Sequence, residues 1–501
     1  MLAACVAGSI ALIAFFYYSP MYDDYCGAFV SMENVDEKQW YTEQNVVQAA
    51  DDEKSGFFRY SGDVSENLPL NGTQYSTQYY WSLSNPYIVQ LRRNLEIPDI
   101  CSQRYPGPDN RAILSALDNV RYYVQQENHI YGYSKVDPES LRAGLENKEW
   151  LLNRYTLWKN AYALPFGYTY ADAITEEAFQ ALSPLEKAEA MLQAVVLSQE
   201  NGEAGQKKRE LSFHSKAVPY EMAVSRGIQA GDGSFIVGDP NETVTLTFMG
   251  DENAETYLRI TGLHYTEILP RDAERNQRLE NMNTYDRRVI LREEKNKIKN
   301  GIISFKCSAE NTEEETVSGD FLYGTPAYDW WNGSEDFTVN LGYDEHGKTA
   351  ITITFQEPGV YTFRSLEVLC QSMDAYPEQV MALAEDSLED VDFHDDTIYN
   401  ATNRVTGRIT LDEAKYLLLS IPYGKGWTAY VNGEAQPLYR ANTMYMALYL
   451  QPGAHEIELR YETPGLKVGA MVSLVSTTVA AAYAFFWFNQ KRRRQEMPAN
   501  G

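Results

Sequence analysis

The stretches Thr243-Val-Thr-Leu-Thr-Phe248 and Thr349-Ala-Ile-Thr-Ile-Thr-Phe355 alternate apolar and polar residues along their length. Successive side chains of a β-strand point to opposite faces, so a period of two predicts strands with one buried face. Similar runs recur between residues 210 and 375, separated by turns rich in Gly, Pro and Asn. We therefore predict an antiparallel β-sandwich over 210–375, with a highly charged insertion at 271–300 between its strands.

The rest of the chain predicts an α+β fold that is rich in β-structure. Residues 20–209 mix helical and strand-like patterns, so we expect a mixed α/β domain there. Within it, Ser183, Pro184 and Glu186 form the pattern of a capping box and precede an apolar stripe, which is typical of a helix start.

Two further elements are expected after the sandwich. Residues 376–401 predict a helical linker, because Pro377 precedes apolar residues at helical spacing. Residues 402–465 predict a small C-terminal β module, in which Asn432-Gly433 indicates a hairpin with a type I′ turn.

Apolar segments bracket the chain. Val468 to Phe488 is 21 residues without a formal charge, so a transmembrane helix is predicted at 466–490, since ~20 residues cross a hydrocarbon core of ~30 Å. Residues 1–19 predict a second, retained transmembrane helix rather than a signal peptide, because they lack a basic region and an Ala-x-Ala site. The tail at 491–501 opens with four basic residues and should stay in the cytoplasm, which leaves the bulk of the chain outside the cell.

The composition excludes several classes of function. The chain has 43 Lys and Arg against 70 Asp and Glu, a net charge of −27. Nucleic acid is excluded as a partner, because its binding requires a positive surface that neutralises phosphates. The six His residues are scattered and no HExxH, GxSxG or P-loop motif is present. The sequence therefore predicts no catalytic residue, no metal site and no cofactor.

Two groups of polar or reactive residues remain open to interpretation. The run Glu389–Asp396 gathers oxygen ligands, but it lacks the spacing of a calcium-binding loop, so we interpret it as a solvated linker. An extracellular location permits disulfides between four cysteines, which allow three pairings that the sequence does not distinguish: Cys26, Cys101, Cys307 and Cys370.

A predicted loop of the sandwich carries the candidate binding site. Aromatic rings stack on the C–H faces of sugars while Asp and Asn bond their hydroxyls, so we predict these ligand-binding residues: Tyr328, Asp329, Trp330, Trp331 and Asn332. If the segment is extended, one of the two tryptophans packs inward and the other faces solvent. The alternative is a hydrophobic plug that closes the end of the sandwich.

The C-terminal part carries a resemblance to a known family. Two segments there resemble the C-terminal signature of the bacterial YfhO-type membrane proteins: Leu417-Leu-Leu-Ser-Ile-Pro-Tyr-Gly-Lys-Gly-Trp-Thr-Ala-Tyr-Val-Asn-Gly-Glu434 and Gln451-Pro-Gly-Ala-His-Glu-Ile-Glu-Leu-Arg-Tyr-Glu-Thr-Pro-Gly465. Shorter segments upstream are similar to the same family in the same order: Phe57-Phe-Arg-Tyr60, the Tyr/Ser-rich stretch 74–87, Asp118-Asn-Val-Arg-Tyr-Tyr-Val124 and Asn160-Ala-Tyr-Ala-Leu-Pro-Phe-Gly167. The match covers most of the chain, and the C-terminal signature is its specific part.

The resemblance implies a cell-envelope protein related to polytopic, GT-C-like transferases. Some members are linked to the addition of sugars from undecaprenyl-phosphate carriers to wall polymers such as lipoteichoic acid. The family's many N-terminal membrane helices have no counterpart in this sequence, and Met1 falls in what looks like the last of them. We therefore expect a truncated or split gene product, onto which no catalytic residue is carried over.

Two functions follow as hypotheses. In the first, the chain is the extracytoplasmic part of an envelope glycosyltransferase and binds or positions the acceptor. In the second, it is a non-enzymatic, membrane-anchored surface domain that binds glycans or a protein partner. The expected partners are the lipid bilayer, a wall polymer or an undecaprenyl-linked sugar, and a separate polytopic membrane subunit. The expected location is the cell membrane, with the C-terminus in the cytoplasm.

Overall fold

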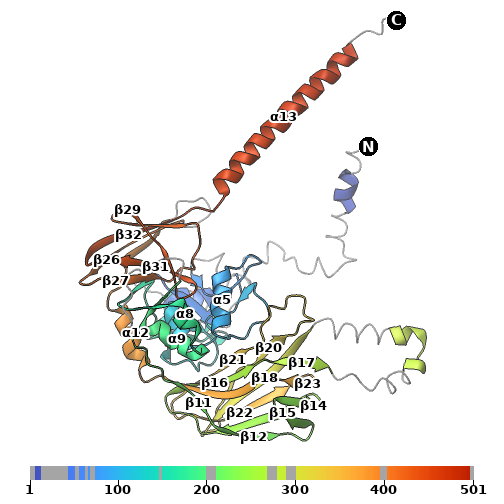
Figure 1. The fold of residues 1–501 in the computed structure, drawn as a ribbon, viewed down its shortest axis with the longest axis vertical. Coiled ribbons are helices and arrows are strands. Elements are labelled where there is room, and N and C mark those ends of the chain that lie inside the picture. Colours follow the sequence, from blue (N-terminus) through green and yellow to red (C-terminus); the bar gives the residue numbers. More distant parts are fainter. Residues whose placement is uncertain are drawn as a thin grey trace.

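The computed structural model describes residues 6–12, 43–50, 56–62, 66–67, 74–145, 149–198, 210–267, 279–288, 301–394 and 403–496. Several β-sheets and a few short helices form the body, and one long helix leads out of it (Figure 1). The predicted α+β, β-rich fold is confirmed. Of the first predicted membrane segment, residues 6–12 are described and are helical, while most of the insertion at 271–300 lies outside the described residues.

The N-terminal unit is built on a mixed sheet with the strand order β2-β1-β5-β7-β6. Its strands are β1 (Arg59–Gly62), β2 (Tyr75–Ser76), β5 (Val120–Val124), β6 (Tyr133–Lys135) and β7 (Leu157–Asn160). The helices of this unit are α4 (Glu43–Ala50), α5 (Pro86–Asn94), α6 (Ala112–Leu117), α7 (Pro138–Leu145), α8 (Glu176–Gln180) and α9 (Pro184–Gln193), and Glu149–Asn153 is a 3-10 helix.

The start of α9 follows the local pattern of the sequence. The Ser183 side chain accepts from the Glu186 backbone N–H at 3.4 Å, and the Glu186 carboxylate accepts from the Ser183 N–H at 2.8 Å. This is the predicted capping box, and Pro184 occupies the first helical position, where a missing N–H costs nothing.

Residues 215–372 form the sandwich. One sheet has the order β11-β24-β16-β21 and contains β11 (Ser215–Val218), β16 (Ala254–Thr261), β21 (Phe337–Asp344) and β24 (Ser365–Ser372). The facing sheet has the order β12-β15-β22-β18-β19, with β20 also paired to β18, and contains β12 (Tyr220–Val224), β15 (Glu242–Phe248), β18 (Ile302–Asn311), β19 (Thr316–Ser318), β20 (Phe321–Gly324) and β22 (Lys348–Phe355). A third sheet at one end contains β13 (Ile228–Gly231), β14 (Ser234–Val237), β17 (His264–Glu267) and β23 (Gly359–Thr362).

The period of two in the sequence places the core of this sandwich. Val244 pairs with Ile353 and Leu246 pairs with Ile351 in the antiparallel ladder of β15 and β22. All four side chains are buried in one cluster with residues of both sheets. Cys307 belongs to the same cluster, and the three described cysteines, which also include Cys101 and Cys370, are free thiols.

The C-terminal strands divide between two sheets, which differs from a separate module at 402–465. One sheet holds β25 (Glu389–His394), β26 (Arg404–Leu411), β28 (Trp427–Val431), β29 (Glu434–Gln436) and β32 (Gly453–Tyr461). The other has the order β8-β27-β31-β30-β10-β9 and unites β8 (Gly167–Tyr170), β9 (Ala173–Thr175) and β10 (Val195–Leu197) with β27 (Lys415–Leu419), β30 (Tyr439–Ala441) and β31 (Tyr445–Leu450).

The reason is the composition of β27, which is apolar on both faces. Tyr416 and Leu418 pack into the core of the N-terminal unit, whereas Leu417 and Leu419 pack into the core of the C-terminal sheet. A strand of this kind must be covered on both sides. The N-terminal and C-terminal parts of the chain therefore share their cores.

The structure contains the turn at Asn432-Gly433 and a helix in the predicted linker. Asn432 and Gly433 have φ of 52° and 82° and connect β28 to β29, as the predicted type I′ turn requires. In the predicted linker, α12 (Tyr376–Ala384) is followed by β25, and residues 395–402 lie outside the described residues.

Helix α13 (Leu466–Glu496) leaves the C-terminal sheet and projects from the body (Figure 1). Among the described residues it is the helix that is long and apolar enough to cross a membrane, over Leu466–Arg492. Its apolar side chains are exposed along its whole length, which a hydrocarbon environment would cover.

Candidate functional site

The predicted binding loop lies between β20 and β21 and is folded as two successive turns. The Tyr328 N–H donates to the Thr325 carbonyl at 2.9 Å, and the Trp331 N–H donates to the Tyr328 carbonyl at 3.0 Å. The condition under which one tryptophan would pack inward, an extended segment, is therefore not met. Trp330 is 61% exposed and Trp331 is 37% exposed, because a turn does not alternate its side chains between two faces.

Asn332 anchors this loop to the N-terminal unit. Its Nδ2 donates to the Asp99 carbonyl at 3.1 Å, and its Oδ1 accepts from the Ser334 N–H at 3.0 Å. Arg93 also donates to the Asn332 carbonyl at 2.5 Å. These bonds occupy the amide that was predicted to contact a ligand, so its evident role is to hold the loop in place.

Tyr328 and Asp329 complete the predicted set. Tyr328 is half-buried, and a Cβ on Gly324 would lie 3.1 Å from its ring. Burial raises the pKa of the Tyr328 phenol, with further contributions from Cys101 and Asp329. Asp329 is exposed. Tyr328 thus fills space under the loop, as in the plug interpretation, while Asp329 and both indole rings remain accessible.

Sequence reasoning missed two aromatic residues close to this loop. Tyr80 ends β3 (Tyr79–Tyr80), which pairs with β4 (Arg104–Tyr105), and it is 50% exposed. Trp81 follows it and is 57% exposed. The Trp81 N–H donates to the Gln103 carbonyl at 2.8 Å. Asp99, four residues before Gln103 in the chain, accepts the bond from Asn332 that is described above. Tyr80 also contributes to the raised pKa of Tyr328.

We call these four exposed side chains the aromatic surface: Tyr80, Trp81, Trp330 and Trp331. The Tyr/Ser-rich composition of 74–87 was a signal for the first pair. Its proximity to the second pair depends on contacts between segments about 250 residues apart, which no local pattern encodes.

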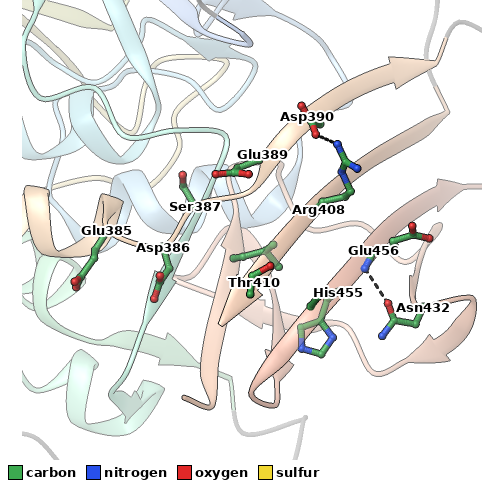
Figure 2. Close-up of a pocket in the computed structure, with 12 residues that line it drawn as sticks. Glu385, Asp386, Ser387, Glu389, Asp390, Arg408, Thr410, Asn432, His455 and Glu456 are labelled. Carbon is green, nitrogen blue, oxygen red and sulfur yellow. Dashed lines mark hydrogen bonds and ion pairs between the residues drawn. The ribbon is translucent and has the colours of Figure 1, made fainter. Parts of the chain in front are cut away.

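A groove of ≈ 590 Å³ opens beside the C-terminal sheet (Figure 2). Five carboxylates line it, belonging to Glu385, Asp386, Glu389, Asp390 and Glu456. The ion pair of Arg408 with Asp390 and the bond from the Glu456 N–H to Asn432 at 2.8 Å occupy one side of it.

The carboxylates of this groove do not form a metal site. Glu389 and Asp390 begin strand β25, whose pairing with β26 shifts register between Glu389 and Asp392. Within the described ranges, no group of three His, Cys, Asp or Glu side chains is placed to hold a metal ion. Asp395 and Asp396 of the run interpreted as a solvated linker lie outside these ranges.

A buried charged centre lies where the N-terminal unit meets β27 and β31. The Asp118 carboxylate accepts from the Tyr105 hydroxyl at 3.0 Å and from the Tyr445 hydroxyl. Arg59 donates to the Asp118 carbonyl at 2.9 Å and to the Ser420 carbonyl at 2.6 Å. Burial raises the pKa of Asp118 to about 6, against the opposing effect of Arg59. Tyr105, Asp118 and Tyr445 are buried and Arg59 is half-buried, and the bonds between them tie distant segments of the chain together.

Comparison with known proteins places the chain in a family. The family described as "Bacterial membrane protein YfhO" matches residues 3–473. A relative from Bacillus subtilis (strain 168), named "Uncharacterized protein YfhO", is 24% identical over 430 residues. The alignment covers 86% of this chain and 40% of that relative, so this chain spans less than half of the relative's length.

Solved structures give weaker likenesses. The C-terminal carbohydrate-binding module of a laminarinase from Zobellia galactanivorans is 11% identical, with a TM-score of 0.16, over 32% of this chain and 94% of that one. The mycobacterial arabinofuranosyltransferase AftD is 12% identical, with a TM-score of 0.16, over 37% of this chain and 14% of that one. Such low TM-scores support no conclusion about fold or function. The family match, in contrast, extends over nearly the whole sequence, and this chain belongs to the bacterial membrane protein family YfhO.

Proposed function

We propose that this chain is the extracytoplasmic part of a YfhO-type membrane protein that supports glycosyl transfer from a lipid-linked sugar to a cell-envelope polymer such as lipoteichoic acid. The observation that carries the proposal is the family match over residues 3–473. The family is similar to polytopic transferases that use lipid-linked sugars. In this proposal, a polytopic membrane subunit performs the transfer, and this chain binds and positions the acceptor.

The proposed orientation places the body outside the cell and the C-terminus in the cytoplasm. It is supported by the basic residues Lys491 to Arg494 at the end of α13, since short basic segments next to a membrane helix stay on the cytoplasmic side. An extracytoplasmic body has direct access to wall polymers.

Acceptor binding is assigned to the aromatic surface. Exposed indole and phenol rings offer flat apolar faces on which sugar rings stack, and Asp329 beside them offers a carboxylate to hydroxyl groups. If each stacked tryptophan contributes roughly 1 kcal/mol, the loss of both Trp330 and Trp331 weakens glycan binding about 30-fold.

The proposal is tested by deleting the gene and measuring the sugar substituents of extracted lipoteichoic acid. We expect the substituents to disappear on deletion and to return with the wild-type gene. The double variant W330A/W331A should restore them only partly at normal protein levels, because both rings are exposed and their loss leaves the cores intact. Trp150→Ala is the matched control, since Trp150 is also exposed, at 46%, but lies outside the aromatic surface. Polymer that keeps its sugars after deletion contradicts a role in glycosyl transfer.

The aromatic surface also favours a second function, that of a non-enzymatic surface domain that binds glycans or a protein partner. Exposed apolar surface of this kind often marks a binding surface, whether or not a chemical reaction follows. The two functions separate in one outcome. If deletion leaves polymer composition unchanged while W330A/W331A still abolishes binding of purified wall polymer, the second function holds.

A further inference from the structure

Strand β21, at the edge of one sheet of the sandwich, makes a series of polar contacts with the N-terminal unit. The Thr338 N–H donates to the Glu96 carbonyl at 2.7 Å, and Arg111 donates to the Thr338 carbonyl at 2.6 Å. Further along the strand, the Tyr343 N–H donates to the His129 carbonyl at 2.7 Å. This seam begins at the loop of Trp330 and Trp331 and follows β21 toward its C-terminal end.

A cleft of ≈ 290 Å³ opens at the far end of the seam, between the two units. Neutral hydrogen-bonding groups dominate its lining. The residues that carry them are four amides and two hydroxyls: Asn110, Gln125, Gln126, Asn340, Thr316 and Ser318. The amides come from the N-terminal unit and from β21, and the hydroxyls come from β19 at the edge of the facing sheet.

The walls of this cleft are held in place by bonds behind the lining. Asn340 Nδ2 donates to the Asp109 carbonyl at 3.1 Å and to the Asn110 carbonyl at 2.8 Å. Asp109 and Asn110 have φ of 57° and 54°, two successive left-handed residues that this amide secures. The Gln126 amide donates to the Arg154 carbonyl at 2.5 Å. The site is thus pre-formed by contacts across the domain boundary, where ligand sites preferentially occur.

The charges at the cleft decide which ligand fits. Glu127 and His129 lie at its lining and contact each other at 3.7 Å, while the remaining lining groups are neutral. No Lys or Arg is among the residues that line it, so a phosphate group would meet the Glu127 carboxylate without a compensating cation. The Asn340 amide is fully used by internal bonds, since its Oδ1 also accepts from the Gly342 N–H at 2.9 Å. Ligand contacts therefore fall to the hydroxyls of Thr316 and Ser318 and to the amide oxygens of two glutamines, Gln125 and Gln126. Hydroxyls donate and accept and amide oxygens accept, which matches a ligand covered with hydroxyl groups.

We propose that this cleft binds one neutral sugar unit of the acceptor polymer. The inference rests on the proposed function and names the polar subsite that accompanies the aromatic surface. Strand β21 connects the two: the tryptophan loop precedes Phe337, and Asn340 and Gly342 of the same strand line the cleft. A sugar substituent is recognised at the cleft by hydrogen bonds, and the polymer extends toward the aromatic rings.

The test uses the full chain in lipid nanodiscs, because sugar-based detergents would occupy the cleft. Calorimetric titrations use neutral mono- and disaccharides of glucose, galactose and N-acetylglucosamine, with glycerol phosphate as the anionic probe. We expect at least one neutral saccharide to bind and glycerol phosphate to bind at least 10-fold more weakly. Two results overturn the proposal. One is tighter binding of glycerol phosphate than of any saccharide. The other is no detectable saccharide binding at about 10 mM, a concentration near the weakest affinity that the titration measures.

Ser318→Trp places a bulky ring at the mouth of the cleft from an exposed position. We expect it to reduce saccharide affinity at least 10-fold with unchanged melting temperature. Glu221→Trp is the matched control, because Glu221 is exposed on β12 at the opposite edge of the same sheet. Equal binding by both variants overturns the assignment to this cleft. Saccharide binding in a protein whose deletion leaves polymer sugars unchanged would instead reject only the proposed function.

Discussion

Arg111 is the residue whose replacement should most directly weaken the seam between the N-terminal unit and the sandwich. It is 1% exposed. Its guanidinium donates to Asp109 at 3.0 Å, to the Leu95 carbonyl at 3.1 Å and to the Thr338 carbonyl at 2.6 Å, and it lies 5.3 Å from the centre of the Tyr257 ring. Arg111→Met keeps much of the volume and removes every one of these polar contacts.

The expected cost follows from what the substitution leaves behind. Removing one partner of a buried ion pair typically costs ~3–5 kcal/mol, because the other charge stays buried without compensation. Burial already raises the pKa of Asp109, which Arg111 counteracts. Because 24% of the Asp109 side chain is exposed, water screens part of the effect, and we expect about 3 kcal/mol.

The assay is thermal unfolding of the full chain at pH 7.5, combined with hydrogen exchange of backbone amides. A loss of about 3 kcal/mol corresponds to a melting temperature lower by about 6–12 °C for a domain of this size. Exchange should accelerate along β21, where Thr338 loses its contact. Arg154→Met is the control, since Arg154 is exposed. A shift of R111M no larger than that of the control, or faster exchange confined to other strands, would refute this account of the seam.

Three further predictions address local structure, ionisation and topology. Gly433→Val should destabilise the C-terminal sheet by about 1–2 kcal/mol, because φ at Gly433 is 82° and a side chain there strains the backbone, although no neighbouring atom would clash with its Cβ. Glu434→Val on the adjacent exposed strand is the control in urea unfolding. Equal unfolding midpoints for the two variants would contradict the proposed role of the turn. Burial raises the pKa of Glu255 to about 7, so the folded state binds more protons than the unfolded chain between about pH 4.5 and 7, and this group lowers stability as pH rises through that window. Glu255→Gln should therefore gain up to about 3 kcal/mol relative to the wild type between pH 5 and 8 in paired melting curves, and a constant difference would be the contrary result. Protease added to intact cells should digest the body and spare a tag placed after residue 501, whereas a digested tag together with a protected body would reverse the proposed orientation.

Local patterns were sufficient for the elements whose stability depends on nearby residues. The alternation in β15 and β22 predicted which side chains enter the sandwich core, because a strand exposes and buries residues with a period of two. The capping box of α9 and the turn at Asn432-Gly433 were predicted for the same reason, since the bonds and φ angles involved lie within a few residues. Helix α13 required only its length and composition.

In the candidate site too, local sequence predicted some features, and others depended on contacts between distant segments. Sequence reasoning selected the tryptophan loop from its composition, but the orientation of the two rings depended on whether the backbone is extended, and the two turns that expose both rings come from the structure alone. It assigned Asn332 to a ligand, although the amide bonds Asp99 of the N-terminal unit. The amide cleft could not be predicted from the sequence, because its walls come from four segments that are far apart in the chain, around residues 110, 126, 317 and 340.

The sequence by itself determined the strand-rich fold class, the faces of individual strands, the ends of helices and the apolar membrane helix, because each follows from neighbours along the chain. Only the tertiary structure decided that β27 and β31 join β8, β9 and β10, and that β21 lies against the N-terminal unit. The physical reason is that Leu417 and Leu418 can satisfy their burial with many apolar partners, and the choice among them is made by packing the whole core. The aromatic surface and the amide cleft are consequences of that choice.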